Sequence, residues 1–429
     1  MTQQPQRSST RNIAAFWLFG VCNNFAYYLM NSAAQDILHK HAEKRLSSAS
    51  NSSVEHCESE LNSRHCSPHS ASLVLLCNIL PGLIIKMFYP FIAKYVPYGV
   101  RHAAVCILQA ASLLIVALAD SVPLALFGVL IGSIQSGLGE SSYLGLASHY
   151  SKHTISYFAS GTGMAGISGS FTYAGLTDSR LGRLTSSQAM LVTLIIPVTF
   201  TIAYYFVLER PETVRKVSVL EPRSWIGLDR AKEKRQSEVS MGTSSLADQA
   251  PKRTLKEKMT IVKCLLKYMI PLFLVYFAEY LINQGLAELV IFDCSSGFGT
   301  SLRAQYRWYQ VLYQVGVFVS RSSGNMISLS MTWIATLPML QFFNAAFFLA
   351  DSIWAFVPHF GLMATLVLYE GLIGGAAYVH SYNHIHKNID PAIKEFALSV
   401  VTLADTAGIV TAALVAIPVH NAICSIPFQ

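Results

Sequence analysis

Two short stretches that lie far apart in the sequence decide the fold: FAYYLMN at residues 25–31 and FAEYLIN at residues 277–283. Five of the seven positions are identical, and each stretch lies within a long apolar segment. Chance similarity between two aromatic-rich helices would also produce such a match. As an internal repeat, it predicts a chain built from two similar halves.

The composition of the 429-residue chain indicates a membrane protein. Hydrophobic residues make up 52% of the chain and charged residues 13%, roughly half the charged fraction of a typical soluble domain. The mean hydropathy is +0.41. The first apolar segment, residues 13–34, is too long for the apolar core of a signal peptide and lacks a convincing cleavage site.

Apolar runs of about twenty residues, the length that crosses a bilayer, mark the candidate spans. There are eleven such runs: 13–34, 71–95, 101–119, 122–148, 156–177, 188–208, 264–292, 305–323, 327–350, 358–380 and 393–419. The runs at 156–177 and 305–323 are the weakest, because the first is rich in Gly and Ser and the second is polar and aromatic. We therefore expect an all-helical, polytopic membrane protein.

Basic residues set the expected orientation. The net charge is +7, and twelve Lys and Arg residues lie in the polar segment 209–259, which marks it as cytoplasmic. Counting back six spans places the N-terminus (1–12) in the cytoplasm and the loop 35–70 in the lumen. That loop holds the chain's only N-x-S/T sequon, so Asn51 is the expected glycosylation site. Eleven spans leave the C-terminus in the lumen, and a twelfth within 417–429 would reverse that.

The repeat and the basic segment together predict a major-facilitator-like architecture of two helix bundles. The expected units are an N-terminal six-helix bundle (13–208), a cytoplasmic linker (209–259) and a C-terminal bundle (260–429). In this architecture the first, fourth, seventh and tenth spans line a central cavity. Those spans carry polar residues at Asn23, Asn24, Glu140, Glu279, Glu288 and Glu370.

Four acidic residues inside predicted spans suggest a polar pathway. A carboxylate at bilayer depth costs several kcal/mol unless it borders water, pairs or takes up a proton. Glu140, Glu279, Glu370 and Asp405 are therefore candidates for proton or cation coupling. The alternative is a structural role, with each carboxylate held in a hydrogen bond between helices. Glu288 follows Glu279 by nine residues, so the two point to different faces of one helix.

Longer motifs in nearly every span resemble those of the battenin family. They are FWL (16–18), CNNF (22–25), SGLGE (136–140), SGTG (160–163), VYFAEY (275–280), NQGL (283–286), QYRWYQ (305–310), SRSS (320–323), YEGL (369–372) and GGAAY (374–378). The resemblance implies an endolysosomal membrane protein with a divergent major-facilitator fold. It also implies a role in clearing glycerophosphodiesters from lysosomes and in lysosomal pH and basic amino-acid homeostasis.

Three basic residues are candidates for solute binding or gating. Arg307 and Arg321 flank the eighth span, and a guanidinium group suits a phosphodiester. The alternative is that both anchor the helix at the membrane interface beside an aromatic belt of Trp308 and Tyr309. Lys86 on the second span could form a gating ion pair with Asp405 on the eleventh, or extend its amine to the interface.

The remaining motifs predict structure more than chemistry. His380 and His384 share a helical face, but no further ligand completes a metal site, so we expect neither a metal nor a cofactor. In the lumenal loop a disulfide between Cys57 and Cys66 is expected. The GxGxxG pattern at 161–166 follows no strand, so it predicts close helix packing and not a dinucleotide site.

The leading functional hypothesis is a lysosomal or vacuolar transporter that exports small polar solutes. Glycerophosphodiesters are the first candidates, basic amino acids are the alternative, and protons are the expected coupling ion. The other hypothesis is a non-transporting regulator or scaffold that binds cytoplasmic proteins through 209–259. No nucleophile elbow, P-loop or paired-Cys motif supports an enzyme, and the clustered charge marks topology, not a nucleic-acid partner.

Overall fold

The computed structural model describes residues 9–34, 36–37, 59, 61, 66, 71–92, 96–147, 149–151, 153–178, 181–209 and 255–427. Within these ranges the chain folds into helices and contains no strand. The predicted all-helical fold is therefore confirmed. The sequon residue Asn51 and the predicted disulfide partner Cys57 lie outside the described residues.

Each of the eleven predicted spans corresponds to one helical rod in the described residues, and two of the rods are broken into consecutive segments. The rods are α1 (Thr10–Ser32), α3 (Ala71–Ile92), α4 (Tyr98–Leu118), α5 (Val122–Ala147), α6 (His153–Thr177), α7 (Ser186–Val192) with α8 (Ile195–Ile202) and η2 (Ala203–Val207), α10 (Leu255–Leu281) with η4 (Ile282–Leu286) and η5 (Ala287–Leu289), α11 (Leu302–Ser322) followed by η6 (Ser323–Asn325), α12 (Met331–Trp354), α13 (Phe360–Asn388) and α14 (Pro391–Cys424). Because α10 begins at Leu255, the last residues of the predicted linker 209–259 are helical.

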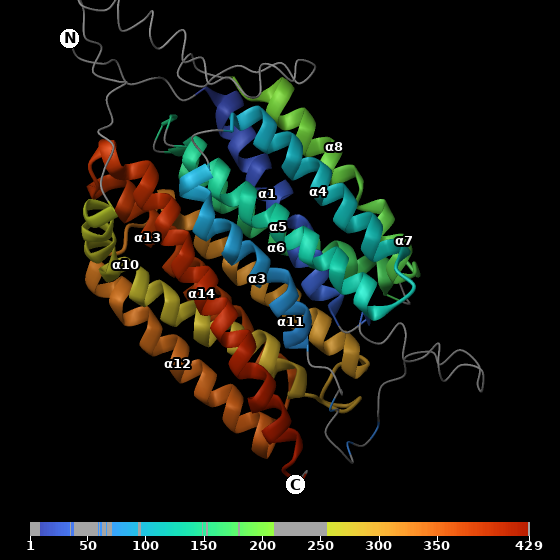
Figure 1. Cartoon of the computed structure of the whole chain (residues 1–429). Coiled ribbons are helices and arrows are strands. Elements are labelled where there is room, and N and C mark those ends of the chain that lie inside the picture. Colours follow the sequence, from blue (N-terminus) through green and yellow to red (C-terminus); the bar gives the residue numbers. More distant parts are fainter. Residues whose placement is uncertain are drawn as a thin grey trace, which may run out of the picture.

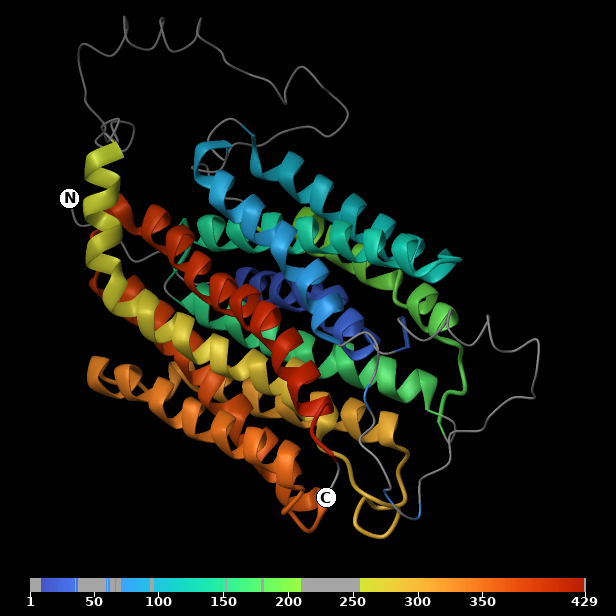
Figure 2. The same cartoon turned by 60° about the horizontal axis from the view of Figure 1, so that its bottom comes forward.

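The rods form two halves that lie side by side, α1 to η2 in one and α10 to α14 in the other (Figure 1). The halves meet where α6 packs on α11 and α3 packs on α14. Helices α4, α7 and α8 cover the outer side of the first half, and α12 covers the outer side of the second (Figure 2). This two-bundle arrangement is the predicted major-facilitator architecture.

Position explains why α6 and α11 were the weakest spans in the sequence. Eight helices of the described residues are long and apolar enough to cross a membrane by themselves, and these two are not among them. Both lie at the contact between the halves, where they pack against protein on several sides. A helix that is shielded from lipid can carry small and polar residues that a lipid-facing helix cannot.

Glycines bring α6 close to its neighbours on two sides. A β-carbon on Gly161 would overlap the backbone oxygen of Trp17 on α1, and one on Gly166 would overlap the side chain of Gln314 on α11. The prediction that the GxGxxG pattern serves close helix packing is therefore confirmed.

We expect Gly161→Ala to destabilise the protein and Gly175→Ala, on the same helix, to leave it unchanged or slightly more stable. Forcing an extra carbon into packed backbone costs about 1–3 kcal/mol, whereas a β-carbon at Gly175 would meet nothing within 4 Å. The melting temperature of the two purified variants in detergent measures the difference. Equal melting temperatures would show that α1 and α6 do not pack as closely as described.

A disulfide joins the two halves at one end of the molecule. Cys66 bonds to Cys424 at the end of α14, with their Cα atoms 6.0 Å apart. The predicted pairing of Cys66 with Cys57 is therefore wrong. That prediction paired the two cysteines of the lumenal loop, whereas the true partner is 358 residues away and is brought near by the fold. Because α14 is continuous up to Cys424, residues 417–424 complete the eleventh span and form no twelfth.

We name the two ends of the molecule by their contents. The disulfide end holds Cys66 and Cys424, and α1 ends there (Figure 1). The linker end is where α1 and α10 begin and the first half finishes. At the linker end Arg11 of α1 donates a hydrogen bond to the backbone oxygen of Phe206, 2.8 Å away, and lies 3.5 Å from Glu209.

Candidate solute-binding cavity

A polar cavity lies between the two halves. Its empty volume, counted together with the open solvent at its mouth, is about 570 Å³. The first, fourth, seventh and tenth spans (α1, α5, α10 and α13) all contribute side chains, as the architecture predicts. Helices α3, α6, α11 and α14 complete the wall.

The internal repeat places equivalent residues on both sides of this cavity. Tyr28 on α1 and Tyr280 on α10 occupy the same repeat position, and both line the wall. Tyr27 also lines it, and its hydroxyl donates a hydrogen bond to the hydroxyl of Tyr280 at 3.1 Å. The two copies of the repeat therefore meet across the boundary between the halves.

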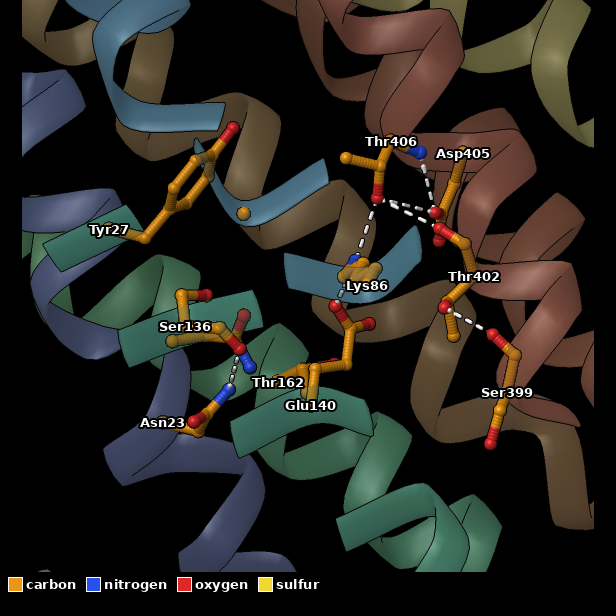
Figure 3. Close-up of polar contacts among 12 residues, drawn as sticks. Asn23, Tyr27, Lys86, Ser136, Glu140, Thr162, Ser399, Thr402, Asp405 and Thr406 are labelled. Atoms are coloured by element: carbon orange, nitrogen blue, oxygen red, sulfur yellow. Dashed lines mark hydrogen bonds and ion pairs between the residues drawn. The ribbon is translucent and has the colours of Figure 1, made fainter. Parts of the chain in front are cut away.

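Lys86 is the central charge of the cavity (Figure 3). Its Nζ lies 2.6 Å from Oε2 of Glu140 on α5 and donates a hydrogen bond of 2.7 Å to Oγ1 of Thr406 on α14. The backbone N–H and the hydroxyl of Thr406 both donate to Oδ1 of Asp405, at 2.6 and 3.0 Å. Lys86 thus joins a carboxylate of its own half to a threonine–aspartate pair of the other half.

The predicted direct ion pair between Lys86 and Asp405 is wrong, as is the alternative that Lys86 extends to the membrane interface. Lys86 is only 5% exposed and pairs with Glu140. The reason is that α3 and α5 pack against each other within one half. Asp405 does line the cavity, but it reaches Lys86 through Thr406.

Arg321 is the second cation of the cavity. Its Nη1 donates to Oγ1 of Thr162 at 2.6 Å, its Nη2 donates to the hydroxyl of Tyr276 at 2.9 Å, and the guanidinium lies 4.3 Å from the ring centre of Tyr378. Among the described residues it forms no ion pair, and its buried Nε has no hydrogen-bond partner. Arg321 therefore faces the cavity with hydroxyl groups and an aromatic ring around it and no carboxylate bound to it.

Arg307, the other predicted anion ligand, lies outside the cavity. Its Nη1 is 3.6 Å from Oδ2 of Asp36, just beyond the end of α1, and the same oxygen accepts a hydrogen bond from Tyr173 at 2.6 Å. The alternative of an aromatic belt at this point is also wrong for Tyr309, which is buried and stacks on Phe360. Arg307 therefore connects α11 to the first half near the disulfide end.

Two of the three glutamates predicted to reach the cavity do not line it. Glu140 does, and its Oε1 accepts a hydrogen bond from Tyr378 at 3.2 Å. Glu279 is buried beside the cavity and accepts a hydrogen bond from Tyr313 on α11, in a space that Gly374 leaves open for its carboxylate. The face of α10 that carries Glu279 is thus turned towards α11, while Tyr276 and Tyr280 line the cavity.

Glu370 is buried deeper in the second half. Its Oε1 accepts a hydrogen bond of 2.8 Å from Asn283, the last residue of the second repeat. The Oε2 atoms of Glu370 and Glu279 are both buried without a hydrogen-bond partner. The prediction that Glu279 and Glu370 reach the cavity is therefore wrong, although both remain unusual buried acids.

Of the other candidate residues, one lines the cavity and the others lie elsewhere in the fold. Asn24 lines the cavity. Glu288 lies 2.8 Å from Nδ1 of His420 on α14, and His384 is 3.1 Å from the hydroxyl of Tyr268. His380 is buried. The described part of the chain contains no group of three His, Cys, Asp or Glu side chains that could hold a metal ion.

Among the described residues, four hydrogen bonds cross the cavity from one half to the other. They join Tyr27 to Tyr280, Lys86 to Thr406, Tyr378 to Glu140, and Arg321 to Thr162. Sequence reasoning missed the tyrosines, although Tyr28 and Tyr280 stand in the repeat itself. If the halves rock against each other, these bonds must break or be replaced by bonds to a solute.

Several curated relatives match nearly the whole chain, and two of them illustrate the range. Battenin of Canis lupus familiaris is 40% identical over 420 residues, which cover 96% of this chain and 91% of that protein. Protein BTN1 of Saccharomyces cerevisiae is 31% identical over 423 residues, which cover 95% of this chain and 94% of that protein.

Solved structures share the fold at low sequence identity. The D-xylose-proton symporter has a TM-score of 0.58 at 12% identity and is matched over 94% of this chain and 88% of its own. The human organic anion transporter MFSD10 has a TM-score of 0.57 at 14% identity, over 98% of this chain and 96% of its own. These similarities show the major-facilitator fold.

The family model described as CLN3 protein matches residues 14–426. Together with the identity to battenin over nearly the full length of both chains, this match shows the family. The chain belongs to the CLN3 protein family, the family of battenin, and is a multi-pass membrane protein with the fold of the major-facilitator transporters.

Proposed function

We propose that this protein transports small anionic or zwitterionic solutes, glycerophosphodiesters first, through the cavity between its halves. Arg321 carries the proposal, because it is a buried cation in that cavity with no ion pair among the described residues. A buried guanidinium without a carboxylate is costly by itself and offers a phosphodiester strong, charge-assisted hydrogen bonds. Its position between the halves lets a bound anion hold both of them.

The charges that line the cavity also support a coupled proton. Lys86 and Arg321 supply two positive charges, and Glu140 and Asp405 supply two negative charges when ionised. Binding a monoanionic phosphodiester would leave an excess negative charge in a poorly solvated space. A proton taken up by one carboxylate restores the balance, so solute and proton would bind together and leave an acidic lumen together.

Glu279 is the proposed proton sensor. It is buried one helical turn from cavity-lining Tyr276, and one of its two carboxylate oxygens has no hydrogen-bond partner. An ionised carboxylate in such a place is expensive, which favours a proton on it. The proton would be gained when the cavity opens to an acidic compartment and lost when it opens to the cytosol.

We place the protein in the lysosomal or vacuolar membrane, with the disulfide end in the lumen and the linker end and N-terminus in the cytoplasm. Disulfides form on the non-cytoplasmic side of membranes, and Cys66 and Cys424 are bonded. The basic segment 209–259 begins at the opposite end. Both features support the same orientation.

Asn51→Gln should remove a glycan from the protein when it is made in eukaryotic cells. The reason is that the loop carrying Asn51 also carries Cys66, whose disulfide supports a lumenal location. The electrophoretic mobility of both proteins before and after endoglycosidase treatment measures the glycan. If the natural protein shows no shift and cytosolic protease cuts 35–70 in intact vesicles, the proposed orientation is reversed.

Proteoliposomes test the proposed function directly. Labelled glycerophosphoglycerol, a monoanionic phosphodiester, is supplied together with labelled glycerol and lysine to vesicles that hold the purified protein, with and without a pH gradient. We expect saturable uptake of the phosphodiester that is faster with the gradient, and no uptake of glycerol. Uptake of lysine alone would instead identify the carboxylates Glu140 and Asp405 as the solute ligands. Uptake of none of the three would favour a regulator or scaffold.

A further inference from the structure

A second chemical site lies at the disulfide end, away from the cavity. Nε2 of His420 is 3.6 Å from Sγ of Cys424, and Nδ1 of the same ring is 2.8 Å from Oε1 of Glu288. His420 and Glu288 are both buried, with side chains 1% and 3% exposed. A carboxylate, an imidazole and a sulfur thus stand in line, with the sulfur in the bond to Cys66.

Two elements hold this arrangement in place. His420 and Cys424 are one helical turn apart on α14, and Glu288 comes from η5, where α10 loses its regular helical form. The Glu288 carboxylate therefore lies against Nδ1 of the ring, without the alignment of a hydrogen bond, while Nε2 faces the sulfur of Cys424. A second Cys–His pair with this spacing, Cys106 and His102, shows the contrast, because its cysteine is free and His102 contacts a tyrosine hydroxyl at 2.7 Å.

We propose that the Cys66–Cys424 bond is a thiol–disulfide exchange site that small-molecule thiols open at Cys66. Cys66 is exposed, whereas Cys424 is partly buried beside His420. An attacking thiolate forms a new bond to Sγ of Cys66, and the Cys66–Cys424 bond breaks. The electron pair stays on Sγ of Cys424, where the adjacent imidazole stabilises the thiolate that leaves.

A second thiol completes the reaction. Its thiolate attacks the small-molecule sulfur of the mixed disulfide, which frees Cys66 as a thiolate and releases the small molecule as its own disulfide. Two thiols are oxidised and one protein disulfide is reduced, so the electrons balance. Because Cys66 follows the first span and Cys424 ends the last helix, reduction removes a covalent tie between the two halves.

Reduction of the full-length protein by glutathione, followed by alkylation and mass spectrometry, tests the proposal. We expect His420→Ala to slow the opening of the Cys66–Cys424 bond by about tenfold, because a leaving thiolate that is not stabilised departs more slowly. Glu288→Gln should give an intermediate rate. His153→Ala, which removes an exposed histidine at the start of α6, should match the natural protein.

Two further measurements distinguish a direct effect of His420 on the exchange reaction from a general loss of structure in the variants. Cys294 is also disulfide-bonded, and its bond should open at the same rate in every variant. The glutathione adduct of the natural protein should form on Cys66, and His420→Ala should move part of it to Cys424. The proposal is overturned if His420→Ala leaves the rate unchanged, if it slows or speeds both bonds equally, or if the natural adduct lies on Cys424. The proposal is also overturned if glutathione does not open the Cys66–Cys424 bond in the folded protein.

Discussion

Lys86→Met should abolish solute uptake by proteoliposomes. The change leaves the partly buried Glu140 without its cation and removes the hydrogen bond that reaches Thr406 in the other half. Removing one partner of a buried ion pair typically costs about 3–5 kcal/mol, so both the binding of the solute and the stability of the cavity should fall. Initial uptake rates, normalised to the amount of folded protein recovered by gel filtration, measure the effect.

A double variant separates charge from folding in that experiment. Lys86→Met with Glu140→Gln removes both charges, so it should recover much of the stability of the natural protein and none of the uptake. Lys267→Met, which changes an exposed lysine on α10, should keep normal uptake. If the single Lys86 variant transports at the natural rate, the cavity charges do not take part in transport.

Glu279→Gln should make uptake independent of the pH gradient while solute binding persists. An amide has nearly the same shape as the carboxylic acid and can still accept the hydrogen bond from Tyr313, but it cannot release a proton. With an acidic medium on the disulfide side, the natural protein should be stimulated and the variant should not. Uptake at a series of pH gradients gives the comparison.

Parallel variants identify the acid that carries the proton. Glu257→Gln changes an exposed carboxylate at the start of α10 and should behave as the natural protein does. If Glu279→Gln keeps the natural pH profile, coupling belongs to another acid. Glu370→Gln and Glu140→Gln then become the variants to compare, since Glu370 also has a buried oxygen without a partner and Glu140 lines the cavity.

Much of the fold could be predicted because few backbone structures are stable inside a bilayer. A chain in lipid must satisfy its backbone within helices, so long apolar runs become rods and basic segments mark the linker. The repeat at residues 25–31 and 277–283 then indicated two halves, and its Tyr28 and Tyr280 do line the cavity from both. Even α6, a weak span, carried a usable signal in Gly161 and Gly166, which bring it close to α1 and α11.

The site was harder to predict because it depends on rotation and on contacts between distant helices. Sequence places Glu279 on the seventh span but does not say which side of α10 faces the cavity. Successive residues on a helix point about 100° apart. A helix rotated by one residue would therefore place Glu279 in the cavity instead of Tyr280. The same holds for two pairings. Lys86 pairs with Glu140, and Cys66 bonds to Cys424, because of how distant helices pack. The spacing of residues within one segment does not predict such contacts.

The binding of a phosphodiester to the purified protein tests the central claim most directly. Labelled glycerophosphocholine is titrated against the natural protein, Arg321→Gln and Arg307→Gln, with unlabelled choline and glycerol as competitors. Arg321 lines the cavity, whereas Arg307 pairs with Asp36 near the disulfide end. Losing one charge-assisted hydrogen bond to phosphate costs about 1.5–3 kcal/mol, or roughly a tenfold to hundredfold loss of affinity. We therefore predict saturable binding that Arg321→Gln weakens by that factor and Arg307→Gln leaves unchanged. Equal affinity in the natural protein and Arg321→Gln would contradict the claim that this cavity binds the anion.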